Sequence, residues 1–304
     1  MTKTTSLLGI LITILAGIFL YMQLCSSCNV STAVDTVEEA ADTIAEPVAP
    51  AKTSYPFAFG DGEYAYSEND NYNFNVSSSS ILMPLAQKVT DGIASLKGFL
   101  SGNDGKVINI TGYFKSSETN DSAFPDLGLA RANAVKNHLV ENGVSSAQIN
   151  TMSKLMDEMV PEDNIYYGPV EYSLGDKAAD AEDEIKALYD KIKADPLVLY
   201  FDTAEASIDL SVKQRQQVAD ISRYLDKVEN AKCDVVGYTD NEGRRRTNMK
   251  LGQERADFAK AYLMQNGIAE GKIKTDSKGQ RDPVASNETE EGRAKNRRTV
   301  ISIK

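Results

Sequence analysis

The chain has little of the residue types that most catalytic and metal centres need. It contains one histidine, His138, and three cysteines among 304 residues. Metal sites rich in histidine and cysteine are therefore excluded, and a Ser-His-Asp or Cys-His hydrolase would have to be built around that single imidazole. Cys25 and Cys28 follow an apolar run and Cys233 lies in a predicted strand. No disulfide framework is therefore expected to hold the folded part together.

Basic residues are also too few to balance the acids. The 33 Lys and Arg residues face 44 Asp and Glu residues, which gives a net charge of -11. This charge argues against a bulk attraction to nucleic acid or anionic lipid, so any anion site must be local. The hydrophobic content of 41% is ordinary for globular proteins, and the length suffices for two domains of typical size.

Long apolar runs are absent except near the N-terminus. After a short segment, 1–6, residues 7–24 are almost unbroken apolar sequence without a charge. The run has about the length that a membrane-spanning helix needs, roughly 20 residues, and exceeds the roughly 7–15 apolar residues of a cleaved signal peptide. We therefore expect a single transmembrane helix that is retained. Lys3 precedes it and no Lys or Arg follows until Lys52, which orients the bulk of the chain outward.

Other interpretations of this end stay open. Residues 1–24 could be removed, and Cys25 or Cys28 could then carry a lipid as in an outer-membrane lipoprotein, although the preceding residues match that motif poorly. The two thiols could also oxidise to each other. Residues 25–54 contain alanine, valine, threonine, acids and two prolines, so they are expected to form a flexible tether.

Two segments of the chain, 55–176 and 197–304, are versions of each other. The matching pairs occur in the same order in both: Ile110-Thr-Gly-Tyr113 with Val236-Gly-Tyr238, Leu127-Gly-Leu-Ala-Arg-Ala132 with Leu251-Gly-Gln-Glu-Arg-Ala256, Asn142-Gly143 with Asn266-Gly267, Ile149 with Ile273, and 74–81 with 201–208. We call these segments the first and second copy. Residues 177–196 are charged and alanine-rich with a helical period, so they are expected to form a connecting helix.

Each copy is predicted to alternate strands and helices. In the second copy, strands are expected at 197–201, 233–238, around Ile273 and at 299–303, with one helix starting near Ser211 and another ending at Asn266-Gly267. This pattern predicts an α+β fold, with the transmembrane helix followed by two tandem βαβαβ sandwich domains.

Several motifs lie in the second copy in a fixed order. They are Phe201-Asp-Thr203, Gly237-Tyr-Thr-Asp240, Asn248 before Leu251, Arg255-Ala256, and Glu291-Gly-Arg-Ala-Lys-Asn-Arg-Arg298. With these motifs the second copy closely resembles the OmpA-like peptidoglycan-binding domain, which outer-membrane anchors, peptidoglycan-associated lipoproteins and flagellar stator proteins share. That family usually has histidine where Tyr238 stands, a departure that leaves the Thr-Asp pair intact.

The resemblance implies a non-catalytic anchor in a Gram-negative cell envelope, with the bulk of the chain in the periplasm. Its partners would be peptidoglycan and the membrane, with no cofactor, metal or nucleic acid. The implied ligand is the meso-diaminopimelate side chain of the wall peptide, whose free end carries an ammonium and a carboxylate on one carbon. Asp240 would accept from the ammonium, and Arg255 would bind the carboxylate with two parallel hydrogen bonds. Asn248, Thr239 and Asp202 would add polar contacts, while Arg297 would join the site or support Asp240.

Taken singly, an aspartate after a strand is usually a turn residue and an arginine on a helix is usually a solvated partner of an acid. Because the other motifs accompany them, Asp240 and Arg255 are predicted to be ligand-binding residues. Arg293 and Arg298 are interpreted as ordinary ion-pair residues. The first copy keeps an arginine, Arg131, at the position of Arg255, but Lys115 or its neighbour Phe114 occupies the position of Asp240. A lysine would repel an ammonium, so the first copy is predicted not to bind this ligand. It could instead be a spacer, a self-contact or a docking surface for another envelope protein.

Two rival functions compete with the anchor. A stator-like ion channel component pairs one N-terminal span with such a domain, but proton-conducting stators carry an acid inside the membrane and residues 7–24 contain none. A wall hydrolase would need paired carboxylates in a cleft, a metal cluster or an activated nucleophile, and the sequence offers no recognised arrangement of that kind.

Overall fold

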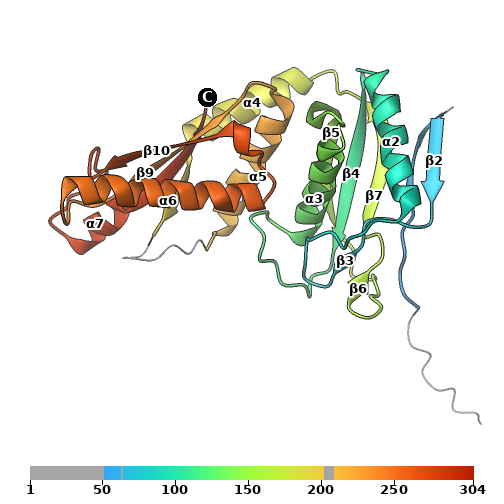
Figure 1. Ribbon diagram of the computed structural model, residues 1–304, viewed down its shortest axis with the longest axis horizontal. Coiled ribbons are helices and arrows are strands. Elements are labelled where there is room, and N and C mark those ends of the chain that lie inside the picture. The colour runs from blue at the N-terminus through green and yellow to red at the C-terminus, as the bar shows by residue number, and fades with distance from the viewer. Residues whose placement is uncertain (1–50, 63, 202–208) are drawn as a thin grey trace, which may run out of the picture. The chain divides into compact units, whose positions relative to one another are not determined.

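The computed structural model describes residues 51–62, 64–201 and 209–304. The expected transmembrane helix at 7–24, the two N-terminal cysteines and Asp202 lie outside these residues. Within the described ranges, no helix combines the length and the apolar character that crossing a bilayer requires. The mixed α+β class expected from the sequence is confirmed, since both copies combine helices with short sheets (Figure 1).

The first copy is built on a three-stranded sheet with the order β5-β4-β7, in which β4 is parallel to β5 and antiparallel to β7. A hairpin of β1 and β2 and a short antiparallel pair of β3 and β6 accompany it. The elements of this copy are β1 (Phe57–Asp61), β2 (Tyr64–Glu68), β3 (Phe74–Asn75), α2 (Gln87–Ser101), β4 (Lys106–Phe114), α3 (Leu127–Glu141), η1 (Ser146–Gln148), β5 (Ile149–Leu155), β6 (Ile165–Tyr166) and β7 (Val170–Asp176).

The second copy is built on a four-stranded sheet with the order β10-β9-β11-β8, in which the central β9 is parallel to β10 and antiparallel to β11. Its elements are β8 (Leu197–Tyr200), α5 (Val212–Lys227), β9 (Cys233–Tyr238), α6 (Arg245–Gln265), η2 (Glu270–Lys272), β10 (Ile273–Gly279), α7 (Glu290–Asn296) and β11 (Arg298–Ile303). Between the copies, α4 (Ala181–Ala194) lies inside the segment for which a helix was expected.

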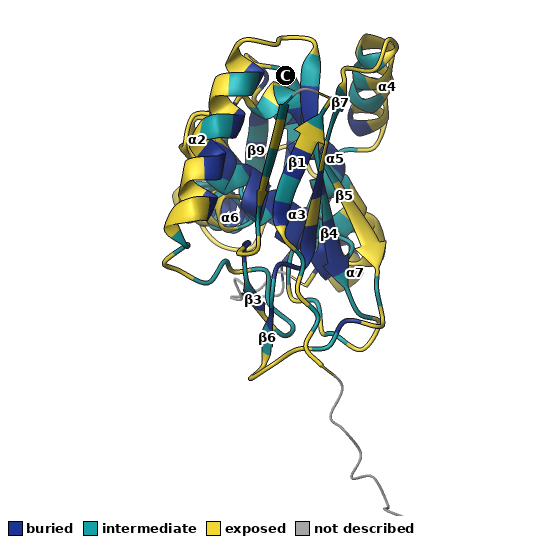
Figure 2. Cartoon of the chain, turned by 90° about the vertical axis from the view of Figure 1, so that its right-hand side faces the viewer, coloured by how far each residue is buried: buried dark blue, intermediate teal, exposed yellow. Residues whose placement is uncertain are grey.

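Apolar faces explain why these elements pack as they do. In α2 the buried residues recur at helical spacing and include Val89, Ile93, Leu96 and Leu100, so one side of the helix faces the core and the other faces solvent (Figure 2). In α5 the side chain of Ser211 accepts a hydrogen bond from the backbone N–H of Gln214, which forms a capping box and begins the helix where the sequence predicted.

Glycine pairs bring one helix of each copy against the central strand. In the second copy, a Cβ atom on Gly237 of β9 would lie only 1.8 Å from the carbonyl oxygen of Gly252 in α6. In the first copy, a Cβ atom on Gly112 of β4 would lie 2.0 Å from the carbonyl oxygen of Gly128 in α3. Only glycine permits this approach. The same strand-to-helix contact therefore positions the arginine-bearing helix in both copies.

Helix ends also follow the sequence prediction. Gly143 after α3 and Gly267 after α6 have φ values of +90° and +88°. This left-handed conformation is easy for glycine, and it ends a helix by directing the chain away from the helix axis. Asn266-Gly267 therefore ends α6 as predicted, and its counterpart Asn142-Gly143 ends α3 in the same way.

Candidate functional site

A hollow of about 330 Å³ opens in the second copy where β9, α6 and α7 meet. In Figure 1, α7 lies beside one end of α6. The lining residues come from the loop after β9, from α6 and from the segment 290–297: Thr239, Asp240, Glu242, Asn248, Leu251, Arg255, Glu290, Arg293 and Arg297. Three of them are acids and three are arginines, so the lining carries both charges in equal number.

Asp240 stands two residues after the end of β9, and its side chain is 14% exposed. One carboxylate oxygen accepts from Nη1 of Arg297 at 3.0 Å, and the other accepts from the backbone N–H of Glu242 at 3.1 Å. A carboxylate has about four acceptor positions, so two bonds leave capacity for a ligand.

Arg255 lies on α6 and is only 4% exposed. Its Nη1 donates to the carbonyl oxygen of Tyr238 at 3.2 Å, and the guanidinium lies over the ring of Phe201 at 5.6 Å. The buried Nε has no hydrogen-bond partner among the described residues. Burial lowers the pKa of Arg255 from its ordinary value, although the nearby charge of Asp240 opposes this effect. A buried arginine in this state gains from an anionic partner.

Arg297 joins two acids across the hollow. Its Nη1 donates to Asp240 and its Nη2 donates to Glu290 at 2.8 Å. Burial acts to lower the pKa of Arg297, but the hydrogen bonds to Glu290 and Asp240 outweigh it and the net pKa is raised. The sequence left two roles for this residue, and the geometry combines them, because Arg297 both lines the hollow and holds the Asp240 carboxylate.

Two smaller polar residues complete the wall around Asp240. The amide nitrogen of Asn248 donates to the Asp240 backbone carbonyl at 3.3 Å and to Oε1 of Gln280 at 2.8 Å. The Thr239 hydroxyl donates to the same Asp240 carbonyl at 2.8 Å. Of the six residues proposed from sequence, five therefore lie around one hollow, and Asp202 lies outside the described residues.

The ring of Tyr238, which stands where related domains usually have histidine, does not line the hollow. The guanidinium of Arg298 lies over that ring at 3.9 Å from its centre. Tyr238 therefore contributes to the hollow through its backbone carbonyl, which accepts from Arg255 and orients it. This contribution does not depend on the identity of the side chain.

Sequence reasoning missed the contribution of α7. Glu290 at the start of this helix bonds Arg293 and Arg297, and all three residues line the hollow. Arg293 was interpreted as an ordinary ion-pair residue; it does pair with Glu290, but it also forms part of the wall. Residues three and seven positions apart share a helix face, and this spacing was the available signal.

The corresponding position in the first copy has a different chemistry. Lys115 follows β4, and its ammonium donates to the carbonyl oxygen of Met159 at 2.9 Å. Arg131 is fully buried and pairs with Glu118 at 2.5 Å. No zwitterion could meet both a free acid and a free arginine there.

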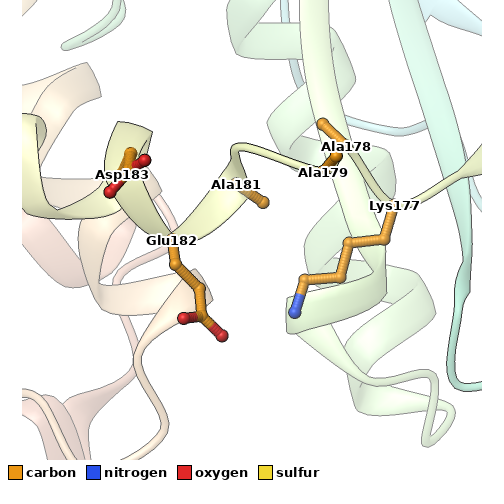
Figure 3. A pocket seen from close by; sticks show the side chains of 6 residues that line it. All are labelled: Lys177, Ala178, Ala179, Ala181, Glu182 and Asp183. Carbon is orange, nitrogen blue, oxygen red and sulfur yellow. The ribbon is translucent and has the colours of Figure 1, made fainter.

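A second hollow of about 310 Å³ lies at the start of α4 (Figure 3). Its lining consists of Lys177, three alanines, Glu182 and Asp183. These side chains make none of the buried, convergent polar contacts found around Asp240. The hollow lined by Asp240 and Arg255 is therefore the stronger candidate for a binding site.

Known proteins resemble parts of the chain. Outer membrane protein A of Bordetella avium is 40% identical over 94 residues, which cover 31% of this chain and 48% of that protein. A peptidoglycan-associated lipoprotein of Buchnera aphidicola is 39% identical over 89 residues, covering 29% and 51%, respectively. The peptidoglycan-binding protein ArfA of Mycobacterium bovis is 41% identical over 86 residues, covering 27% and 26%. The chain thus spans about half or less of the length of these relatives.

A crystal structure of the peptidoglycan-associated lipoprotein from Burkholderia pseudomallei is 26% identical, with a TM-score of 0.32, and covers 35% of this chain and 89% of that one. The profile of the OmpA family matches two separate segments, residues 73–162 and 200–297, which together make up more than half of the chain. The protein is therefore a member of the OmpA family.

Proposed function

We propose that the protein is a non-catalytic cell-envelope anchor whose second copy binds peptidoglycan without a covalent bond. The ligand group would be the zwitterionic end of the meso-diaminopimelate side chain in the wall peptide. The observation that carries this proposal is the single hollow that contains both the Asp240 carboxylate and the nearly buried Arg255 guanidinium.

The charge of the lining supports a zwitterionic ligand. Asp240, Glu242 and Glu290 face Arg255, Arg293 and Arg297, so the lining has no net charge. A ligand with only a carboxylate or only an ammonium would leave one set of charges without a new partner. A ligand with both groups on one carbon can satisfy the two sides at once.

The carboxylate of the ligand would be bound by Arg255. Both Arg255 and Arg297 have a buried Nε without a partner among the described residues. Arg297, however, already donates to two carboxylates, whereas Arg255 donates only to the backbone carbonyl of Tyr238. Bonds from a charged donor to a carboxylate are roughly twice as strong as neutral hydrogen bonds, and they gain further strength in a partly buried site. Arg255 is therefore the natural carboxylate receptor.

The ammonium of the ligand would be bound by Asp240. Arg297 and the N–H of Glu242 hold its carboxylate in place, and about two acceptor positions remain. Arg297 therefore acts as a positioning residue for Asp240. Asn248 and Thr239 both bond the Asp240 backbone carbonyl, which holds the same loop from the other side.

The acids of the hollow are poorly suited to hydrolysis. A glycosidase needs one carboxyl group that keeps its proton near neutral pH, which requires a raised pKa. The hydrogen bonds from Arg297 and Arg293 instead lower the pKa of Glu290, and Asp240 is held by Arg297. This arrangement supports binding rather than catalysis.

The placement in the envelope rests on the sequence and on relatives. Relatives are named as an outer membrane protein, a peptidoglycan-associated lipoprotein and a peptidoglycan-binding protein. We propose that residues 7–24, or a lipid on Cys25 or Cys28, hold the chain at a membrane while residues 25–54 let the second copy reach the wall.

The test is sedimentation of the full-length chain with purified wall sacculi. Arg255→Ala and Asp240→Ala are each expected to weaken binding by about 2–5 kcal/mol, which is about 30-fold to several thousand-fold in Kd, because each leaves a shielded partner charge unpaired. Free meso-diaminopimelate should compete with wild-type binding.

Two exposed residues of the second copy provide controls of matching charge. Arg244→Ala and Asp257→Ala remove the same charges from side chains that do not line the hollow, so both should bind sacculi like the wild type. Wild-type affinity in both hollow variants, with intact folding by circular dichroism, would refute the proposed site. Release of soluble wall fragments by the wild type would refute the non-catalytic role.

A further inference from the structure

The first copy contains an arginine in the same local setting as Arg255. Nη1 of Arg131 donates to the carbonyl oxygen of Tyr113 at 2.8 Å, as Nη1 of Arg255 donates to Tyr238. The Arg131 guanidinium lies over the ring of Phe74 at 5.7 Å, close to the 5.6 Å between Arg255 and Phe201. The two copies therefore build the same arginine receptor.

The receptor of the first copy already holds a carboxylate. Oε1 of Glu118 accepts from Nη2 of Arg131 at 2.5 Å, and Oε2 accepts from Nη1 at 3.1 Å. The backbone N–H groups of Ser77 and Lys115 each donate to the same carboxylate at 2.9 Å. Four donors fill the approximately four acceptor positions of a carboxylate. The side chains of Glu118 and Arg131 are 1% and 0% exposed, so water does not compete.

The chain delivers this carboxylate from a loop rather than from the helix. Glu118 lies between β4 and α3, in a loop that is tied down on both sides of it. The Ser116 backbone and hydroxyl both donate to Asp157, and the Thr119 N–H donates to the hydroxyl of Ser77. Ser77 itself has a φ of +57°, a left-handed conformation that is uncommon for serine. The loop is thus built to hold the carboxylate against Arg131.

The remaining donors of Arg131 are also used. Nε donates to the carbonyl oxygen of Ser78 at 3.0 Å, and no buried side-chain nitrogen of Arg131 lacks a partner among the described residues. Arg255, by contrast, keeps a buried Nε without such a partner. One arginine is saturated by its own chain and the other is not.

We propose that Glu118 is an internal ligand, whose carboxylate fills a carboxylate-binding site that Arg131 and the N–H groups of Ser77 and Lys115 form in the first copy. Removal of the Glu118 side chain opens that site to a small external carboxylate. The native first copy is closed to carboxylate ligands, and Glu118 contributes to its stability in the way a bound ligand would. This proposal concerns the first copy alone and stands whether or not the second copy binds the wall.

The test is rescue of Glu118→Ala by acetate, which supplies the methylene carbon and carboxylate that the substitution removes. Thermal unfolding of the full-length chain is measured at pH 7 in sodium acetate and in sodium chloride of equal ionic strength. In chloride the midpoint of the first copy should fall by about 10 °C or more, because an unpaired buried charge remains. Acetate should recover several degrees of that loss by binding only the folded form.

Three controls separate a vacated carboxylate site from a general salt effect. Wild type should show no such rise in acetate, and neither should Glu118→Gln, in which an amide fills the space. The double variant Glu118→Ala with Arg131→Met should not respond, because the receptor is gone. Glu118→Ser leaves room for acetate but keeps a polar group. Its unfolding midpoint is measured in the same two salts, in case Glu118→Ala fails to fold in chloride.

Rescue by acetate that depends on Arg131, in either small-residue variant, supports the internal ligand. An equal acetate effect in the double variant would overturn it. The proposal would also be overturned if neither Glu118→Ala nor Glu118→Ser gained stability from acetate, whether these variants are folded or unfolded in both salts.

Discussion

The contact between Gly237 and Gly252 predicts that a single methyl group will disturb the binding hollow from a distance. In Gly237→Ala the new Cβ would lie 1.8 Å from the carbonyl oxygen and 2.7 Å from the carbonyl carbon of Gly252. Contacts under 3.0 Å are essentially never seen, so α6 and β9 must separate by more than about 1 Å. Because the obstacle is backbone, no rotamer change can relieve the clash. Overpacking of this kind typically costs about 1–3 kcal/mol.

For a domain the size of the second copy, this cost corresponds to a fall of about 4–24 °C in the unfolding midpoint, since each kcal/mol shifts it by about 4–8 °C. The shift of α6 also moves Asn248 and Arg255 relative to Asp240. Because the groups of a binding site must stay within about 0.5 Å of their productive geometry, sacculus binding should weaken as well. Differential scanning calorimetry and sacculus sedimentation on the full-length chain measure the two effects.

Gly271→Ala is the matched control for this substitution. No heavy atom lies within 4 Å of a Cβ built at Gly271, and its backbone has no positive φ. This variant should therefore unfold and bind like the wild type. If Gly237→Ala also kept the wild-type midpoint, the close strand-to-helix contact would be wrong and the positioning of Arg255 would need another explanation.

Two further predictions concern stability. Burial lowers the pKa of His138 below its ordinary value of 6.5 in the folded chain, so the unfolded chain takes up the proton first. The urea midpoint of the wild type should therefore fall as the pH drops below about 6.5. His138→Phe should show a weaker fall over the same pH range. Asn296 is fully buried, and its Oδ1 accepts from the backbone N–H groups of Val284 and Ala285. Asn296→Ala should destabilise the second copy by about 1–3 kcal/mol through the loss of those two hydrogen bonds, whereas a loss under about 0.5 kcal/mol in urea titrations would contradict that role.

Local sequence patterns predicted much of the fold because they depend on neighbouring residues. Asn266-Gly267 ended α6 as expected, since a glycine with positive φ is a local requirement, and Asn142-Gly143 ended α3 in the same way. The capping box at Ser211 began α5 for the same reason. The internal repeat predicted which arginine in one copy corresponds to which arginine in the other, and Arg131 and Arg255 do make matching contacts.

Contacts between distant residues were less accessible from sequence. Glu118 lies 13 positions before Arg131, in a loop without a motif, so nothing in the residue pattern indicated that its carboxylate would fill the arginine receptor. Glu290 lies 50 positions after Asp240, and Arg297 joins the two only because α7 packs beside the loop that follows β9. These pairings depend on how the helices and loops meet in space.

Periodicity, caps and ordered motifs are properties of the chain, so the α+β class, the repeated unit and the acid and arginine of the proposed receptor could be predicted before the fold was known. Which of these charges remain available to a ligand depends on the folded arrangement. It paired Arg131 with Glu118 and Asp240 with Arg297, and it left Arg255 with an unpartnered buried nitrogen among the described residues. The interactions of a charge become stronger or weaker with burial and with its neighbours in space, and the order of residues does not specify either one.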